Sequence, residues 1–193
     1  MNLPNKLTLA RIILVPLMMV AFMVEFPYHI FVALGLYIIA ATTDFLDGYI
    51  ARKYNLVTDM GKFLDPIADK LLATTALILI AGYNLIPNPF GLICLFLFVA
   101  RDTIISALRQ IAATKNVVIA ADKWGKYKTF ILDIAIPVIF LFGALSSLNI
   151  NAIVLDVIKW LGYGLMIIAS LLNLISAVNY LIKNRKVFKE NKE

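Results

Sequence analysis

The chain has 193 residues, of which 62% are hydrophobic and 16% charged, and its formal net charge is +6 at pH 7. Soluble domains are about 45–50% apolar, so this composition excludes an ordinary soluble protein and indicates a membrane protein. In a soluble protein the positive charge would suggest nucleic acid; beside long apolar segments it favours anionic lipid and phosphorylated substrates, and we expect no nucleic-acid partner.

Apolar segments of the length that a spanning helix needs, about 20 residues, follow one another along the chain. They cover residues 7–25, 30–52, 63–82, 90–112, 128–146 and 158–182. The pattern predicts an all-α membrane protein with six transmembrane helices in a single domain over residues 1–193. No small-residue cleavage site follows the first segment, so we expect a retained span rather than a signal peptide.

The basic residues predict the orientation in the membrane. The connections near 26–29, 83–89 and 147–157 contain no Lys or Arg, and every Lys and Arg except Arg101 and Lys159 belongs to the opposite ends of the segments. Basic residues accumulate on the cytoplasmic side. We therefore expect both termini and the two basic loops in the cytoplasm.

Two carboxylates close the second segment. Asp44 directly follows the apolar run 30–43, where a carboxylate is costly unless it is paired or bound to a cation. Asp47 lies three residues further on, so both side chains share one helical face. Gly48 and Arg52 lie on the same face, and Gly48 leaves room for a ligand to approach the backbone.

The third segment repeats this arrangement with Gly61, Asp65 and Asp69, which are spaced four residues apart. Two antiparallel helices joined by a short loop then point four carboxylates at one another, and these repel unless cations neutralise them. Oxygen-only ligands suit magnesium, manganese or calcium, and a pair of such ions is a known device for phosphoryl chemistry. The alternative is a set of salt bridges to the neighbouring basic residues Arg52, Lys53, Lys62 and Lys70.

Residues 44–69 resemble the signature of the CDP-alcohol phosphotransferase family, D-x2-D-G-x2-A-R-x8-G-x3-D-x3-D. Every fixed position is matched, by Asp44, Asp47, Gly48, Ala51, Arg52, Gly61, Asp65 and Asp69. The resemblance implies the six-span fold of that family, a homodimer, and an active site that opens to the cytoplasm.

The same resemblance implies roles for these residues. Asp44, Asp47, Asp65 and Asp69 would bind two divalent ions, Mg²⁺ or Mn²⁺, and Asp69 would also act as general base toward an acceptor alcohol. The CDP part of CDP-diacylglycerol would be held by Gly48, Ala51, Arg52 and Gly61. An alcohol is a weak nucleophile, so a base that removes its proton is chemically required.

A second group of basic residues suggests the acceptor. Arg101 and Asp102 interrupt the fourth segment about 16 Å from its start. An arginine at that depth usually lines a cavity or meets an anion. Arg109 lies on the same face, Arg11 lies inside the first segment, and the fifth begins near Lys123, Lys126 and Lys128. Together they predict a pocket for a phosphate, which glycerol 3-phosphate has and serine lacks; the topology alone accounts for most of the lysines but not for Arg101.

The segments NLPNKLTLARIILVP and RDTIISALRQIAATKNVVIAADKWGKYKT resemble bacterial members of the family that use sn-glycerol 3-phosphate. This resemblance implies that the phosphatidyl group passes from CDP-diacylglycerol to that acceptor with release of CMP, in phosphatidylglycerol and cardiolipin synthesis at the bacterial cell membrane. It places Thr8, Arg11, Arg101, Arg109 and Lys126 near the acceptor phosphate. It assigns no role to Asp102 or Asp133.

Other functions stay open at this stage. A related enzyme with inositol phosphate or serine as acceptor has the same signature. A cation transporter that uses the four aspartates predicts broken helices in matching halves of the chain, which the sequence does not show. A lipid-binding scaffold without catalysis does not require Asp69 as a base.

Overall fold

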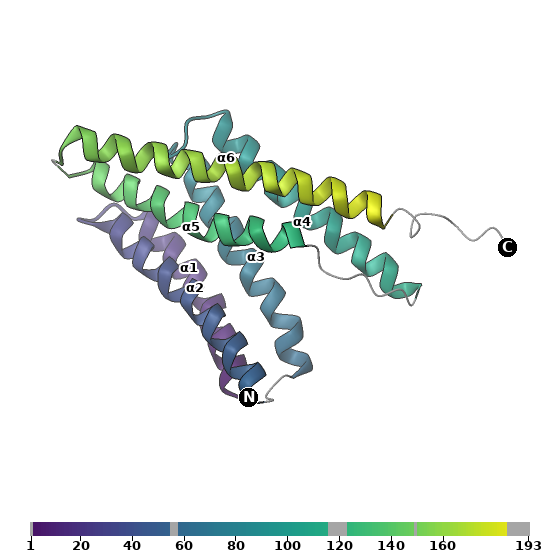
Figure 1. Cartoon of the computed structure of the whole chain (residues 1–193). Helices are drawn as coiled ribbons and strands as arrows, with labels where there is room; N and C mark the ends of the chain where they lie inside the picture. The colour runs from purple at the N-terminus through teal and green to yellow at the C-terminus, as the bar shows by residue number, and fades with distance from the viewer. Residues whose placement is uncertain (1, 55–57, 116–122, 149, 185–193) are drawn as a thin grey trace.

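The structure, a computed structural model, describes residues 2–54, 58–115, 123–148 and 150–184, and the side chains of Phe45, Arg52 and Lys62 lie outside this description. The described parts of the chain form α helices joined by short connections (Figure 1). The helices are α1 (Leu3–Met23), α2 (His29–Lys53), α3 (Asp59–Gly82), α4 (Phe90–Thr114), α5 (Lys123–Ser146) and α6 (Ala152–Lys183). The prediction of an all-α fold is confirmed, although α5 and α6 begin earlier than predicted.

Polar side chains define where several helices begin. Asn2 accepts a hydrogen bond from the backbone N–H of Asn5 at 3.2 Å, Thr58 accepts from Gly61 at 3.1 Å, and Asn151 accepts from Ile153 at 2.9 Å. Each bond satisfies one of the backbone donors that the first turn of a helix leaves without a partner. The caps of α1 and α3 therefore fix the two helix ends nearest to the aspartates.

Within the described residues, five helices, α1, α2, α4, α5 and α6, are long and apolar enough to cross a membrane. Large apolar side chains such as Ile153, Phe96 and Trp160 are exposed on the outside of the bundle, as expected for a surface that faces lipid. The chain is a multi-pass membrane protein. Helix α3, which contains the span predicted over 63–82, is less apolar than these five helices. Its last 18 residues include three charged side chains, Asp65, Asp69 and Lys70.

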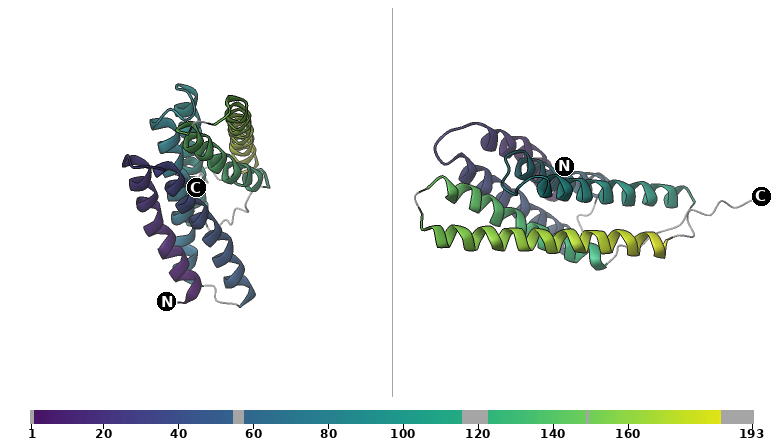
Figure 2. Two further views of the ribbon diagram at one scale, coloured as in Figure 1. Left: turned by 90° about the vertical axis from the view of Figure 1, so that its left-hand side faces the viewer. Right: turned by 90° about the horizontal axis from the view of Figure 1, so that it is seen from above.

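The helices pack as two groups of three. Helix α1 packs against α2 and α3, while α6 packs against α4 and α5. Figure 1 shows α1, α2 and α3 running together toward the N-terminus and α5 and α6 lying side by side above them. The left view of Figure 2 likewise shows α5 and α6 together and set apart from α1. Contacts of α2 with α5, and of α3 with α4 and α5, join the groups.

A buried apolar core fills the space between the two groups. Phe22 of α1, Tyr37 of α2 and Phe140 of α5 are each at most 1% exposed, and the Phe140 ring contacts the rings of the other two. Within the α4–α6 group, Asn173 donates to the carbonyl of Leu97 at 2.9 Å, as expected for an interhelical hydrogen bond. The core thus holds the polar faces of α2, α3, α4 and α5 in fixed positions.

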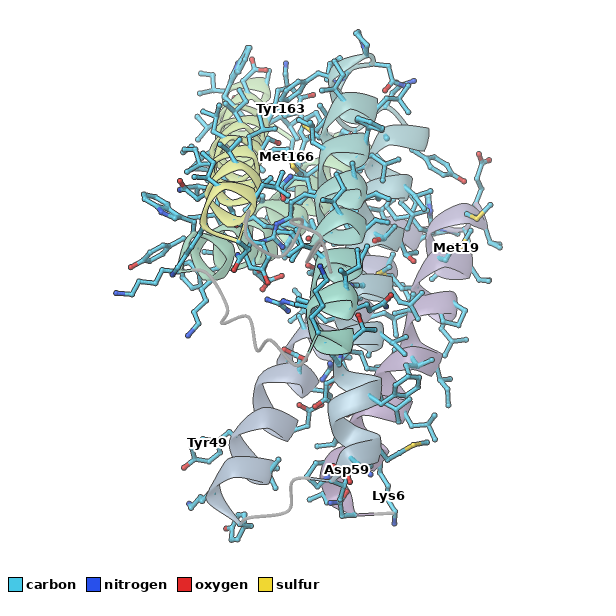
Figure 3. The ribbon with its side chains drawn as sticks, turned by 90° about the vertical axis from the view of Figure 1, so that its right-hand side faces the viewer. Lys6, Met19, Tyr49, Asp59, Tyr163 and Met166 are labelled. Atoms are coloured by element: carbon cyan, nitrogen blue, oxygen red, sulfur yellow. The ribbon has the colours of Figure 1, made fainter. Side chains whose placement is uncertain are left out.

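The start of α1 lies at the same end of the molecule as the last turn of α2 and the first turn of α3 (Figure 1). Figure 3 shows Lys6 and Asp59 close together at this end, with Tyr49 on the nearby part of α2. Tyr163 lies at the opposite end, where its hydroxyl donates to the carbonyl of Leu85 at 3.0 Å. The carboxylates of α2 and α3 therefore belong to the end that carries the N-terminus.

Candidate active site

Helix α1 places two polar side chains between the carboxylates of α2 and α3. The Arg11 side chain is completely buried, and its two terminal nitrogens form salt bridges with Asp44 and Asp47. Thr8, one turn earlier, donates to Asp65 Oδ1 at 2.9 Å and lies 3.3 Å from Asp47 Oδ2. Three of the four predicted aspartates therefore meet around one face of α1.

Asp69 lies about one turn after Asp65 on α3 and connects this cluster with the rest of the site. Its carboxylate interacts electrostatically with Asp44 and Arg11 on one side and with Lys128 and Asp102 on the other. It also lines a cavity between α3, α4 and α5. Of the four aspartates, Asp69 is thus the one that can reach both the carboxylate cluster and a molecule in the cavity.

The donor atoms of the cluster are suitable for a hard divalent cation. The four aspartates offer only carboxylate oxygens, the ligands that magnesium and manganese prefer. In the described part of the chain, however, no three acidic, histidine or cysteine side chains are arranged as a ready metal site. Arg11 instead supplies the positive charge between Asp44 and Asp47, while its buried Nε makes no hydrogen bond. The cluster therefore fits a cation in its chemistry, and a cationic group already lies there.

Gly61 allows the start of α3 to approach α1 closely. A Cβ atom at this position would lie 2.9 Å from Asn5 Oδ1 and 3.3 Å from Thr58 Oγ1. Asn5 is buried and accepts a hydrogen bond from Thr58 at 3.0 Å. The glycine is thus needed for packing beside the cluster, whatever it contributes to a ligand.

The other residues predicted to hold CDP lie on the last two turns of α2. Gly48 and Ala51 are half-buried there. Arg52 belongs to the same helix, but its side chain lies outside the described residues. Their contact with a nucleotide stays a prediction.

The cavity between α3, α4 and α5 has a volume of about 120 Å³. Its charged lining residues are Asp69 and Lys70 of α3, Arg101 and Asp102 of α4, and Lys128 and Asp133 of α5. Leu77, Phe98 and Leu132 supply apolar walls. Three carboxylates and three cations thus surround a space that suits a small polar molecule.

Asp102 holds the two deepest cations of this cavity together. Its carboxylate accepts hydrogen bonds from Lys128 at 3.0 and 3.3 Å and from Arg101 at 2.9 Å. The second terminal nitrogen of Arg101 donates to Ser176 of α6 at 2.8 Å. Gly125 makes this possible, because a Cβ there would lie 3.0 Å from the same nitrogen. Asp102 therefore orients Arg101 and Lys128, and its bond to Lys128 was not predicted from the sequence.

Of the five residues predicted near the acceptor phosphate, only Arg101 lines this cavity. Thr8 and Arg11 lie in the carboxylate cluster instead. Arg109 points to α6, where its Nε donates to the Tyr180 hydroxyl at 3.0 Å and its guanidinium lies over the same ring. Lys126 is exposed and does not belong to the cavity lining. Both assignments stay predictions, while Lys128 is the lysine of this segment that lines the cavity.

The sequence groups Lys128 with Lys123 and Lys126 in a basic pocket, but the resemblance selects Lys126 as the lysine near the acceptor phosphate. The predicted start of the fifth segment at residue 128 would leave Lys128 at the membrane surface. Because α5 begins at Lys123, Lys128 lies more than one turn inside the helix and is only 5% exposed. Its ammonium group lies 4.9 Å from the centre of the Phe98 ring. A correct prediction of where α5 begins would have placed Lys128 inside the helix.

Comparison with known proteins places the site in a family context. Residues 1–177 match the family described as CDP-alcohol phosphatidyltransferase. The chain is 41% identical over 153 residues to the CDP-diacylglycerol--glycerol-3-phosphate 3-phosphatidyltransferase of Bacillus subtilis (strain 168), covering 72% of this chain and 77% of that protein. It is 37% identical over 187 residues to the protein of the same name from Rickettsia bellii (strain RML369-C), covering 97% of each. A rice protein named cardiolipin synthase (CMP-forming) is 32% identical over 193 residues, covering 95% of this chain and 57% of that protein.

Proposed function

We propose that this chain, which belongs to the CDP-alcohol phosphatidyltransferase family, is a phosphatidylglycerophosphate synthase. It transfers the phosphatidyl group of CDP-diacylglycerol to sn-glycerol 3-phosphate and releases CMP, a step toward phosphatidylglycerol and cardiolipin. The observation that carries the choice of acceptor is the cavity that joins Asp69 to Arg101 and Lys128. It offers a base for the attacking hydroxyl and two cations for a phosphate.

In this proposal the carboxylate cluster serves the donor lipid. Two divalent ions, Mg²⁺ or Mn²⁺, would be held by the aspartates, namely Asp44, Asp47, Asp65 and Asp69. When bound, such ions neutralise phosphate oxygens and the charge of the departing CMP. Gly48, Ala51, Arg52 and Gly61 hold the CDP moiety. Thr8 and Arg11 orient the aspartates, which agrees with their hydrogen bonds to Asp44, Asp47 and Asp65.

Asp69 is the proposed general base. It accepts the proton from the acceptor hydroxyl as the oxygen forms its bond to phosphorus and the bond to CMP breaks. Its place in the lining of the cavity, beside Lys128, supports this role. Arg101 and Lys128, which line the same cavity, bind the phosphate of the acceptor. Arg109 and Lys126, which lie outside the lining, are proposed as further cations near this phosphate.

We further propose that α3 crosses the membrane as the third of six spans. Its charged side chains need not meet lipid, because Asp65 contacts Thr8 of α1 and both Asp69 and Lys70 line the cavity. Both termini and the active site then face the cytoplasm of a bacterial cell membrane, in accordance with the distribution of Lys and Arg. The chain forms one domain over residues 1–193 and assembles as a homodimer.

The test is CMP release by the protein purified in detergent, with CDP-diacylglycerol and Mg²⁺. Parallel reactions contain glycerol 3-phosphate, inositol phosphate, inositol, serine or phosphatidylglycerol, and one set contains a chelator. We expect metal-dependent release with glycerol 3-phosphate. Release with phosphatidylglycerol instead would favour the activity in the name of the rice relative, and no release from folded protein with any acceptor and either metal would overturn the proposal.

A further inference from the structure

Asp133 of α5 is a charged residue of the cavity to which the proposed reaction assigns no task. It lies in an apolar stretch of a membrane-spanning helix, between Leu132 and Ile134. An ionisable residue in such a place is costly and is usually part of a functional site. The side chain lines the cavity together with Asp69, Arg101 and Lys128.

The ordinary structural role, an ion pair with a neighbouring cation, is not what the structure shows. The ammonium group of Lys128 is bonded to both oxygens of Asp102. Lys126, one heptad before Asp133, is exposed and outside the cavity lining. Among the hydrogen bonds and ion pairs of the described residues, none involves the Asp133 carboxylate, which interacts with Asp69, Asp44 and Lys128 only at longer electrostatic range.

The charges of the cavity are arranged to recognise a molecule with two kinds of group. Arg101 and Lys128 offer hydrogen-bond donors and positive charge, which suit a phosphate. Asp69 and Asp133 offer only acceptors when ionised, and these suit hydroxyl groups. One hydroxyl is needed for the reaction at Asp69. A carboxylate without a hydrogen-bond partner in the same cavity implies a second hydroxyl.

We propose that Asp133 accepts a hydrogen bond from the C2 hydroxyl of the acceptor and thereby selects a phosphate that carries two neighbouring hydroxyl groups. Asp133 is then a specificity-determining residue, distinct from Asp69, which receives the proton of the reacting hydroxyl. This inference rests on the proposed function, because it takes glycerol 3-phosphate as the acceptor.

The experiment compares two acceptors that differ by one hydroxyl. The compound 3-hydroxypropyl phosphate keeps the reacting hydroxyl and the phosphate of glycerol 3-phosphate and lacks only the C2 hydroxyl. For the wild-type protein we expect kcat/KM to be about 10–100-fold higher with glycerol 3-phosphate, the range for a hydrogen bond to a charged group. In Asp133→Ala the ratio falls close to one, and in Asp133→Asn, which keeps a neutral acceptor, it lies between the two.

The ratio is measured within each variant, so it does not depend on how much of that variant is folded. Asp156→Ala, at an exposed ion pair on α6, is the matched control and should keep the wild-type ratio. An unchanged ratio in Asp133→Ala would overturn the inference, as would a wild-type protein that does not distinguish the two acceptors. Loss of activity toward both acceptors in folded Asp133→Ala and Asp133→Asn would also overturn it. If wild-type protein releases no CMP with glycerol 3-phosphate at all, the proposed function itself fails.

Discussion

Two arginines, the buried Arg11 and the half-buried Arg101, mark the two halves of the site and differ in what surrounds them. Arg11 is held by Asp44 and Asp47, in a region where carboxylates outnumber cations. Arg101 shares the carboxylate of Asp102 with Lys128, so two cations meet one bonded carboxylate there, while Asp69 and Asp133 lie in the lining of the same cavity. The first region is therefore suited to bind cations and the second to bind an anion. In the proposed function, the carboxylate cluster of α1, α2 and α3 serves the donor lipid and the cavity between α3, α4 and α5 serves the acceptor.

The change that should have the largest effect is Asp69→Asn, at the point where the two regions meet. Asparagine keeps the size of the side chain but cannot accept the proton of the acceptor. We expect kcat to fall by about 10²–10⁴-fold, the usual contribution of a general base. The measurement is CMP release, with the thermal unfolding temperature as a control for folding. Near-normal turnover would remove Asp69 as the base.

Asp102→Asn should weaken the anion-binding region alone. Without the carboxylate, Arg101 and Lys128 repel each other and lose the bonds that orient them. Hydrogen bonds between charged groups contribute about 1.5–3 kcal/mol, so KM for glycerol 3-phosphate should rise about 10–100-fold. The KM for CDP-diacylglycerol, measured in the same preparations, should stay within the wild-type range. An equal rise in both KM values would contradict the division into two regions.

Gly125→Ala should have the smallest effect, because it disturbs Arg101 only through packing. The new methyl group would lie 3.0 Å from Nη2, at the flexible end of the arginine side chain. A cost of about 1 kcal/mol, at the low end for overpacking, corresponds to about a five-fold rise in KM for glycerol 3-phosphate. Gly164→Ala is the matched control, since a Cβ at Gly164 meets nothing within 4 Å. Equal effects of the two substitutions would show that Arg101 tolerates the displacement.

The same comparison explains what the sequence could predict. Asp44 and Asp47 share a face because of helix geometry, and the short connection to α3 brings Asp65 near them. Both are local relations that spacing along the chain reveals. The functional role of Arg101 is predicted for a similar reason. A charged residue inside an apolar segment indicates a functional site even when its partners are not known.

The partners of these side chains depend on how the helices pack against one another. The spacing of residues along the sequence does not reveal this packing. The bonds of Asp102 to Lys128 and of Arg101 to Ser176 join α4 to α5 and to α6. The burial of Arg11 between α2 and the rest of the bundle likewise follows from the position of α1. The early start of α5, which moves Lys128 into the cavity, was beyond the precision of boundaries drawn from hydropathy.

The most direct test of the account is the identity of the lipid that the protein makes. Purified protein would be incubated with CDP-diacylglycerol, Mg²⁺ and glycerol 3-phosphate, and the extracted lipids would be measured by mass spectrometry. The account predicts phosphatidylglycerol phosphate in amounts equal to the CMP released, and neither product when a chelator is present. CMP without this lipid, or a phosphatidyl group joined to a different acceptor, would contradict it.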